Sequence, residues 1–216
     1  MTEASRIALI GLRDFTTIKW YAIPLLSVVL YIYAKEIHKS RLNGNWDPVF
    51  AGLTLFGVDF FNETWNGWVL NISGRSAVWT APGDTALRVM VGWNLEIIFM
   101  FLIAGIVYYY TLSTDSKEKI LDVNNRWFWA IAYSAFCVFV EVILNKGGHL
   151  VWEYAFWGRS FKGIWLIFLF GYFHFFAAII LVLNIKKYKT RICIVSGIYG
   201  LAVLMNIIGA SLGWRY

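Results

Sequence analysis

Six apolar stretches, each close to the length that crosses a lipid bilayer, constrain the fold of this chain more than any other feature of its sequence. A membrane-spanning helix needs about 20 mostly apolar residues. We therefore predict an all-α fold, a polytopic integral membrane helical bundle that forms a single transmembrane domain over residues 1–216. The predicted spans are about 17–34, 49–71, 86–112, 127–145, 163–185 and 191–213.

The composition indicates that lipid is the solvent of this chain. Of its 216 residues, 59% are hydrophobic and 15% are charged, and a soluble domain of this length could not cover so much apolar surface. Aromatic residues reach 19%, including 12 Trp, which is more than two interfacial belts require and predicts an aromatic interior. Cys137 and Cys193 lie in apolar runs without a CxxC pattern, so we expect both to be packing residues.

The basic residues predict the orientation of the spans. The net charge of +6 does not indicate nucleic-acid binding, because Lys and Arg lie in short turns between apolar runs, as topology signals do. Three alternate turns are basic and should face the cytoplasm: 35–41, 117–126 and 186–191. The turns at 72–85 and 146–162 should face outward. The N-terminal stretch is expected to form a short helix on the membrane surface; a seventh membrane element there would reverse the side of the N-terminus.

Four acidic residues fall inside the predicted spans, and we predict that they are the acid–base groups of a site: Asp59, Glu63, Glu96 and Glu141. Each costs about 2.5–3.5 kcal/mol at a helix centre, so these groups should face one another or a polar cavity. In "DFFNETWN", Asp59, Asn62, Glu63 and Asn66 share one narrow stripe of a helix. The two Asn residues fit a seam between helices as well as they fit a site.

Further polar and aromatic residues are predicted to bind the substrate: Asn62, Trp93, Asn94, Asn145, His174 and Asn206. With a rise of about 1.5 Å per residue, Asp59, Glu96 and His174 fall near the midplane, and Glu63 and Glu141 fall in the outer half. A lone His in an aromatic helix is as often a hydrogen-bonded core residue as a functional one. The polar groups are expected to share a layer that is open toward the outer side.

The stretch "FVEVILNKGGHLVWEY", residues 139–154, begins with the pattern of an apolar helix and continues, after two glycines, as a segment rich in polar and aromatic residues. Two consecutive glycines, at 147 and 148, should end the helix. Glu141 would then belong to the buried polar layer. His149 and Glu153 should lie at the rim, on a re-entrant or interfacial segment that forms a lid over the cavity.

These features predict an enzyme that acts on an apolar lipid or isoprenoid. A carboxyl group in an apolar pocket has its ionised form disfavoured and so serves as an acid, and aromatic ring faces stabilise a carbocation. Cyclisation or isomerisation through carboxyl acid–base chemistry uses all of these parts and needs no cofactor. The expected partners are a lipid-like or isoprenoid small molecule and membrane lipid, with no nucleic acid.

The segment "WNLE", Trp93 to Glu96, in a small aromatic-rich chain with several spans resembles the integral membrane terpene cyclases of fungal meroterpenoid pathways. The resemblance covers these four residues, the size and the general architecture. It implies that Glu96 is a proton donor. That family also uses a second acid in a late helix, where this chain has Asn206.

Two alternatives remain open at the level of sequence. The first is a metalloenzyme with iron, in the form of a di-iron centre, or another divalent metal, although the Glu-x-x-His spacing of di-iron bundles is absent. Its ligands would come from Glu63, Glu96, Glu141, His149, Glu153 and His174. The second is a proton-coupled transporter, because intramembrane carboxylates are common in proton relays. Against transport, the two halves of the chain show no repeat.

Overall fold

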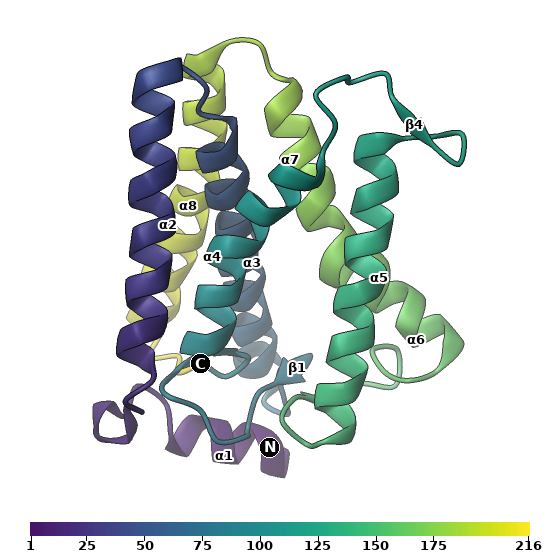
Figure 1. Cartoon of the computed structure of the whole chain (residues 1–216). Coiled ribbons are helices and arrows are strands. Elements are labelled where there is room, and N and C mark those ends of the chain that lie inside the picture. The colour runs from purple at the N-terminus through teal and green to yellow at the C-terminus, as the bar shows by residue number, and fades with distance from the viewer.

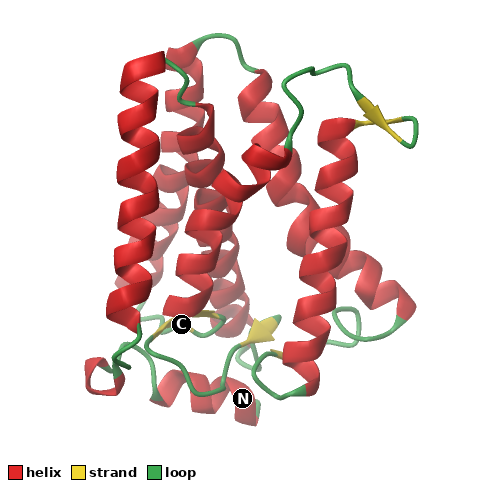
Figure 2. Cartoon of the chain, in the orientation of Figure 1, coloured by secondary structure: helices red, strands yellow, loops and turns green.

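The computed structural model describes residues 1–216, most of which are helical (Figures 1 and 2). The longer helices are α2 (Ala22–Asn43), α3 (Asp47–Ser73), α4 (Leu95–Thr111), α5 (Asn125–Lys146), α7 (His174–Asn184) and α8 (Tyr188–Ser211). The shorter helical segments are α1 (Glu3–Ile10), a 3-10 turn (Phe15–Thr17), α6 (Phe161–Leu166) and η2 (Ile167–Phe173). The last of these is a π-helical stretch that joins α6 to α7 without a break.

Three short antiparallel strand pairs lie in the connections between helices. β1 (Trp79–Thr80) pairs with β6 (Val151–Trp152), β2 (Arg88–Met90) with β3 (Trp93–Asn94), and β4 (Lys119–Ile120) with β5 (Val123–Asn124). The β1–β6 pair joins two loops that are far apart in the sequence. It therefore fixes the α3–α4 connection against the α5–α6 connection at one end of the bundle.

Helix α3 is the central element of the bundle. It packs against α4, α7 and α8, whereas α5 packs mainly on η2 and α7. In Figure 1, α2 and α5 stand at opposite sides of the molecule, and α1 lies across the end where the chain termini are found. The polar stripe predicted on residues 49–71 therefore lies on the helix that has the most neighbours.

Three helical stretches are long and apolar enough to cross a membrane: 125–146, 161–184 and 188–211. α4 is apolar but shorter, with 17 residues. α2 and α3 are long, with 22 and 27 residues, but carry more polar side chains. The length and composition of these helices thus support a membrane protein, and three of the helices are both long enough and apolar enough to cross a bilayer.

Helices occur over all six predicted stretches, but the third is shorter than the predicted 86–112. α4 begins at Leu95, because residues 86–94 contain the β2–β3 hairpin. The side-chain oxygen of Asn94 caps this helix by accepting a backbone N–H three residues later, at 2.9 Å. The prediction that Glu96 lies near the midplane is therefore wrong, since Glu96 lies in the first turn of α4, at the end of the bundle.

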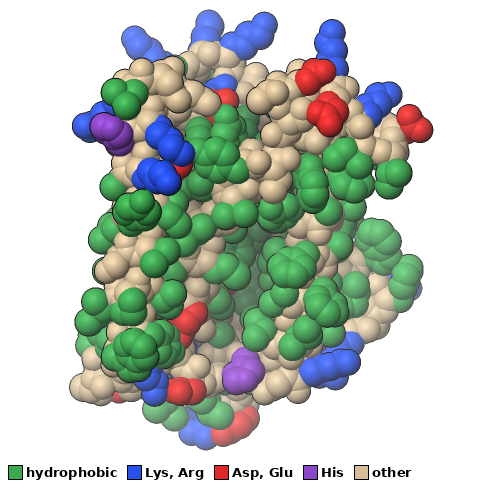
Figure 3. Space-filling view, in the orientation of Figure 1, with side chains coloured by type: hydrophobic (Ala, Val, Ile, Leu, Met, Phe, Trp, Pro, Cys, Tyr) green, Lys and Arg blue, Asp and Glu red, His purple; other side chains and the backbone are tan.

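Basic side chains gather at one end of the molecule. Figure 3 shows Lys and Arg concentrated at the end drawn uppermost, where the α2–α3, α4–α5 and α7–α8 connections lie in Figure 1. At this end the Arg191 guanidinium pairs with Asp47 and donates to the backbone oxygens of Leu183 and Ile185. One arginine thus closes the α7–α8 turn against the start of α3.

The largest apolar core lies in the half of the bundle next to this basic end. It joins α3, α4, α5 and α7, and its fully buried large side chains include Leu55, Tyr108, Phe176, Ile179 and Ile180. Aromatic contacts hold it together, such as Tyr108 against Phe176 with ring centroids 4.9 Å apart. The other half of the bundle is less completely filled, and the candidate site lies there.

Asn66 has a structural role. Its sequence position fitted either a seam that holds elements together or a functional site, and its contacts support the first of these. It is fully buried on α3. Its side-chain oxygen accepts the backbone N–H groups of Val78 and Trp79 at 2.8 and 3.2 Å, and its amide donates to the Trp79 oxygen at 2.8 Å. Asn66 therefore anchors β1 to α3 and places the Trp79 side chain.

We predict that Asn66→Leu lowers the free energy of unfolding by about 3 kcal/mol or more, because three buried backbone groups lose their partner and each costs about 1–3 kcal/mol. Denaturation of the detergent-solubilised protein, followed by tryptophan fluorescence, measures this loss. Asn71→Leu is the matched control on the same helix. Asn71 is only partly buried, so water replaces its bonds to Gly67 and Arg215, and the loss should stay below about 1 kcal/mol.

Candidate functional site

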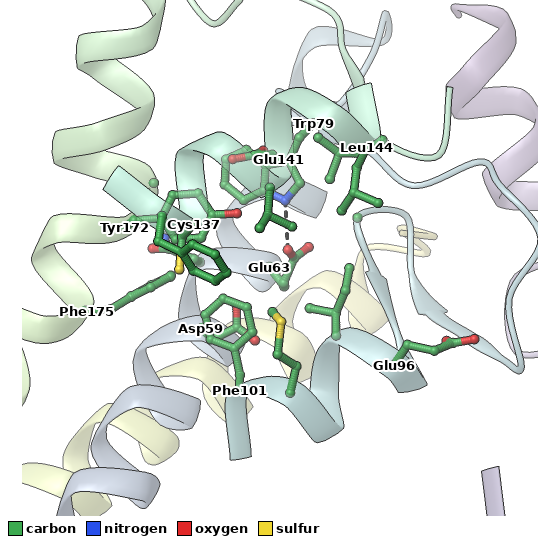
Figure 4. Close-up of a pocket in the computed structure, with 18 of the residues that line it drawn as sticks. Asp59, Glu63, Trp79, Glu96, Phe101, Cys137, Glu141, Leu144, Tyr172 and Phe175 are labelled. Atoms are coloured by element: carbon green, nitrogen blue, oxygen red, sulfur yellow. Dashed lines mark hydrogen bonds between the residues drawn. The ribbon is translucent and has the colours of Figure 1, made fainter. Parts of the chain in front are cut away.

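A cavity of about 260 Å³ lies between α3, α4, α5 and η2, and most of its wall is apolar. Figure 4 shows the arrangement of its side chains, with Glu63 in the middle. The wall is formed by Asp59, Asn62, Glu63, Trp79, Gly92, Glu96, Ile97, Met100, Phe101, Phe136, Cys137, Val140, Glu141, Leu144, Leu150, Trp157, Gly171, Tyr172 and Phe175. A mainly apolar cavity with a few convergent polar groups is the usual form of a small-molecule site.

The cavity has an apolar side opening between α4 and α5. Three of its wall residues are also exposed on the outside of the bundle: Met100 on α4 at 50%, and Phe136 and Leu144 on α5 at 63% and 38%. Figure 3 shows the corresponding hollow in the face of the molecule, surrounded by hydrophobic side chains.

Three buried carboxyl groups each accept a hydrogen bond from a tryptophan indole. Trp93 donates to Asp59 at 2.8 Å, Trp79 to Glu63 at 2.7 Å and Trp152 to Glu141 at 2.9 Å. The acids come from helices α3 and α5, and they are 3–6% exposed. All three indoles come from the connections at the end of the bundle opposite the basic one. The predicted acids Asp59, Glu63 and Glu141 thus meet in one cavity.

Glu63 differs from its two neighbours in having a fully buried oxygen without a hydrogen-bond partner. Its Oε1 atom accepts the Trp79 indole, whereas the buried Oε2 atom has no hydrogen-bond partner. The backbone of Gly92 packs directly against this group, since a Cβ atom there would lie 2.5 Å from Oε2 and 2.7 Å from the Trp79 ring. Glu63 is part of the cavity wall, and its Oε2 atom is a buried polar atom at the edge of that wall, next to Gly92.

The segment that follows α5 folds back over the cavity, as predicted for a lid. α5 ends at Lys146, and Gly148 adopts a positive φ of 73° that turns the chain. β6 then pairs with β1, and Leu150 and Trp157 enter the cavity wall. Trp157 stacks on Trp79 with ring centroids 5.6 Å apart and an interplanar angle of 27°. The two connections therefore cover the outer end of the cavity with an aromatic layer.

The π-helical stretch η2 shapes the opposite wall, to which it contributes Gly171 and Tyr172. π-helical turns inside α-helices are frequent at functional sites. His174 follows directly and lies 3.1 Å from the Asn62 amide through its Nε2 atom, so the two predicted residues form a pair. Asn62 lines the cavity and His174 stands behind it, outside the wall.

Glu96 occupies a different environment from the other three acids. Its carboxyl group accepts hydrogen bonds from the Tyr21 hydroxyl at 2.7 Å, the Thr85 hydroxyl at 2.5 Å and the Ala86 backbone N–H at 2.8 Å. In Figure 4 its side chain lies apart from the group around Glu63. Glu96 reaches the edge of the cavity, but its hydrogen bonds connect α4 to the loops.

The remaining predicted substrate-binding residues lie outside the cavity wall. Trp93 supports Asp59, and Asn94 caps α4. Asn145 accepts from Arg159 at 2.8 Å and donates to the Leu150 oxygen. Asn206 on α8 donates to the Thr64 hydroxyl at 2.7 Å and to a backbone oxygen of its own helix. These four residues position other groups in the structure.

The six predicted alternative metal ligands are not gathered into one centre. No group of three or more His, Cys, Asp or Glu side chains is arranged to hold a metal ion. His149 packs against Gly83, and Glu153 accepts the Thr2 hydroxyl at 2.7 Å, both in the loops that cover the cavity. His174 is paired with Asn62 and Glu96 is held by the loops, so only Glu63 and Glu141 of the six share the inner cavity.

Sequence reasoning missed Trp79, and it placed Trp152 and Trp157 on the lid segment without assigning them to the site that they complete. The excess of 12 Trp over what two interfacial belts require was the available signal. A buried indole N–H needs an acceptor, and the buried carboxylates of α3 and α5 are the strongest acceptors near these loops. Gly92 had no comparable signal, because only the packed structure shows that a side chain there would strike Glu63.

Comparisons with known proteins agree with a membrane location. A model of a family described as an uncharacterized membrane protein family matches residues 2–211. A protein of Archaeoglobus fulgidus, described as an uncharacterized protein, is 43% identical over 214 residues, which cover 99% of each chain. No solved structure matches the chain. The match over nearly the whole length shows that this chain belongs to that uncharacterized membrane protein family.

Proposed function

We propose that this chain is a six-span membrane enzyme that isomerises or cyclises an apolar lipid or isoprenoid by proton transfer from a carboxyl group. Glu63 is the proton donor, and Asp59 and Glu141 are the partner acids. The observation that carries this proposal is the buried, unpartnered Oε2 atom of Glu63 in the wall of a cavity with an apolar side opening. A carboxyl group in an apolar site is a common proton donor in enzymes.

The arrangement of the helices supports six spans. α2, α3 and α4 run alongside the three strongly apolar stretches in Figure 1 and share their ends. α3 carries Asp59 and Glu63, but both face the cavity, so these acids are not in contact with lipid. The three basic connections lie at one end, which by the excess of Lys and Arg is the cytoplasmic end.

The side opening favours an apolar substrate. Because Met100, Phe136 and Leu144 line both the cavity and the lipid-facing surface, a chain dissolved in the bilayer enters without crossing water. The inner wall adds Phe101, Phe175 and the stacked tryptophans, whose ring faces attract positive charge. A carbocation formed in this cavity would be stabilised by these rings and shielded from water.

The proposed isomerisation needs only the carboxyl groups of the cavity to donate and remove protons. The Glu63 carboxyl donates a proton to one carbon of a C=C bond, and the π electrons form the new C–H bond, which leaves a carbocation at the other carbon. A carboxylate at Asp59 or Glu141 then removes a proton from an adjacent carbon, and that C–H pair forms the shifted C=C bond. Return of the proton to Glu63 restores the enzyme, so the step consumes no co-reactant.

An enzyme is favoured over a transporter by the packing at the basic end. The apolar core that contains Tyr108, Phe176, Ile179 and Ile180 fills the bundle between the cavity and the basic connections. A proton path to that end would need polar groups through this layer. The acids instead lie in a cavity that opens sideways toward lipid.

We assign proton donation to Glu63 rather than to Glu96, the residue implied by the resemblance of "WNLE" to terpene cyclases. Glu96 already accepts three hydrogen bonds from Tyr21, Thr85 and Ala86. Trp93 of the same segment is committed to Asp59. Both residues of the segment therefore hold the site together, whereas Glu63 has an oxygen free for a substrate.

We predict that the protein transfers deuterium from D₂O to carbon in an unsaturated lipid. The detergent-solubilised protein is incubated in D₂O with geranylgeraniol and, separately, with oleyl alcohol, and carbon-bound deuterium is measured by mass spectrometry. Glu63→Gln should lower the rate by about 100-fold or more, because a general acid contributes about 10²–10⁴-fold. Glu36→Gln is the matched control, a buried glutamate on α2 that binds Tyr110 and Lys39, far from the cavity.

Two results of this experiment would contradict the proposal. One is the absence of carbon-bound deuterium above the protein-free reaction for both alcohols. The other is equal incorporation by Glu63→Gln and the unsubstituted protein. A third result would also count against a specific role of Glu63: a similar fall in the deuterium-transfer rate of Glu63→Gln and Glu36→Gln, with a matching loss of thermal stability. Such a fall would show that both variants lose activity because they unfold.

We further predict that Glu96→Gln reduces stability more than it reduces deuterium transfer. Glutamine offers a single oxygen to the three donors Tyr21, Thr85 and Ala86, and its amide group points a further donor at them. The free energy of unfolding should fall by about 1–3 kcal/mol. Deuterium transfer at a temperature where the variant is folded should stay within about threefold; a loss as large as that of Glu63→Gln would restore Glu96 as the donor.

A further inference from the structure

The charge of the cavity wall restricts the polar end of its ligand. All charged side chains in the wall are acidic: Asp59, Glu63, Glu96 and Glu141. No Lys, Arg or His belongs to the wall. A phosphate or carboxylate placed there would be a buried anion without a cation to pair with, and every ionised acid of the wall would repel it, which is strongly unfavourable.

The hydrogen bonds of the acids restrict the ligand further. Each of the three inner carboxyl groups has one oxygen bound to an indole, so one side of each is tied to the protein. Glu63 is 5% exposed, and its Oε2 atom is a buried polar atom without a hydrogen-bond partner. An unsatisfied buried polar atom costs about 1–3 kcal/mol, and a ligand hydroxyl, which both donates and accepts, removes this cost whether Glu63 is protonated or not.

Arg159, a basic residue near the cavity, does not change the conclusion that an anionic ligand finds no cation in the wall. Arg159 belongs to a separate, more open hollow on the far side of Trp152 and Trp157. Its Nε atom is bound to Asn145 at 2.8 Å, and the side chain is exposed. The aromatic layer of Trp79 and Trp157 thus stands between the acids and this guanidinium.

We propose, building on the function above, that the ligand is a long-chain alcohol whose hydroxyl group forms hydrogen bonds with the acids of the cavity, and that the cavity rejects its phosphate ester. The hydroxyl occupies the region bounded by Glu63, Asp59 and Glu141, and the chain extends toward Met100 and Phe136 at the side opening.

Native mass spectrometry in detergent tests this ligand class with four probes that share a twelve-carbon chain: dodecanol, dodecyl phosphate, dodecanoate and dodecylamine. The alcohol should bind with an affinity at least about 100-fold greater than the phosphate or the carboxylate, because neither anion finds a cation in the wall. Glu141→Gln keeps an oxygen for the Trp152 indole and removes one negative charge. It should therefore weaken the discrimination against the phosphate by about tenfold.

Each other outcome would overturn the inference. Phosphate binding as strong as that of the alcohol would show that an anionic end is accepted, and stronger binding of the amine would show that the acids select a cation. If Glu141→Gln and the control Glu36→Gln both kept the original ratio of alcohol affinity to phosphate affinity, the acids of the wall would not be the cause of the discrimination.

The binding test and the deuterium test fail independently. Selective alcohol binding without deuterium transfer contradicts the proposed reaction and leaves the ligand class intact. Deuterium transfer to geranylgeranyl phosphate but not to geranylgeraniol contradicts the ligand class and leaves the reaction intact.

Discussion

Three indole–carboxyl hydrogen bonds hold the outer half of this structure together. Asp59 and Glu63 lie in α3 and Glu141 lies in α5, and their indole partners lie in the connections at one end of the bundle. Each bond therefore ties a loop to a helix as well as satisfying an acid. A carboxyl group in a helix bundle without such a partner would lose about 1–3 kcal/mol for each unmade bond, and more if charged. The position of the loops, the shape of the cavity and the orientation of the acids all depend on these three contacts.

The cavity opens sideways because α5 is attached to the bundle through η2 and the β1–β6 pair rather than through α4. The end of the bundle near the loops is closed by stacked tryptophans, and the basic end is closed by the apolar core. The space between α4 and α5 is therefore the natural entrance. In water such an apolar opening would promote aggregation, but in a bilayer it is filled by lipid chains. The membrane location and the proposed ligand are thus supported by the same feature of the packing.

The helices and the acidic stripe could be predicted from the sequence, because both depend on local periodicity. Asp59, Asn62 and Glu63 share one face of any helix that contains them, and apolar runs of about 20 residues predict the helices. The start of α4 could not be predicted in this way. Residues 86–94 are apolar enough to continue a span, but the hairpin around Gly92 is stabilised by contacts with Glu63 and Asn66, which are distant in sequence. The misplaced depth of Glu96 follows from that single error.

The fold-back after α5 shows the opposite case, in which a local signal predicted a tertiary feature. Two consecutive glycines ended the helix, and the aromatic residues after them needed a surface to cover. The sequence could not identify that surface, which is the ring of Trp79. Asn66 in turn holds the backbone of Trp79 in place. Pairwise contacts of this kind carry most of the information about the site.

Most polar groups around the cavity are committed to a partner, which makes the exceptions informative. Asn62 is bound to His174, Asp59 to Trp93 and Glu141 to Trp152, whereas the Oε2 atom of Glu63 and the indole nitrogen of Trp157 are buried without a partner. Gly92 packs closely against the Glu63 carboxyl group. Proteins retain local violations of good packing mainly where function requires them. Two unpartnered polar groups in the wall of one apolar cavity are therefore the feature that most strongly supports a ligand with a polar end.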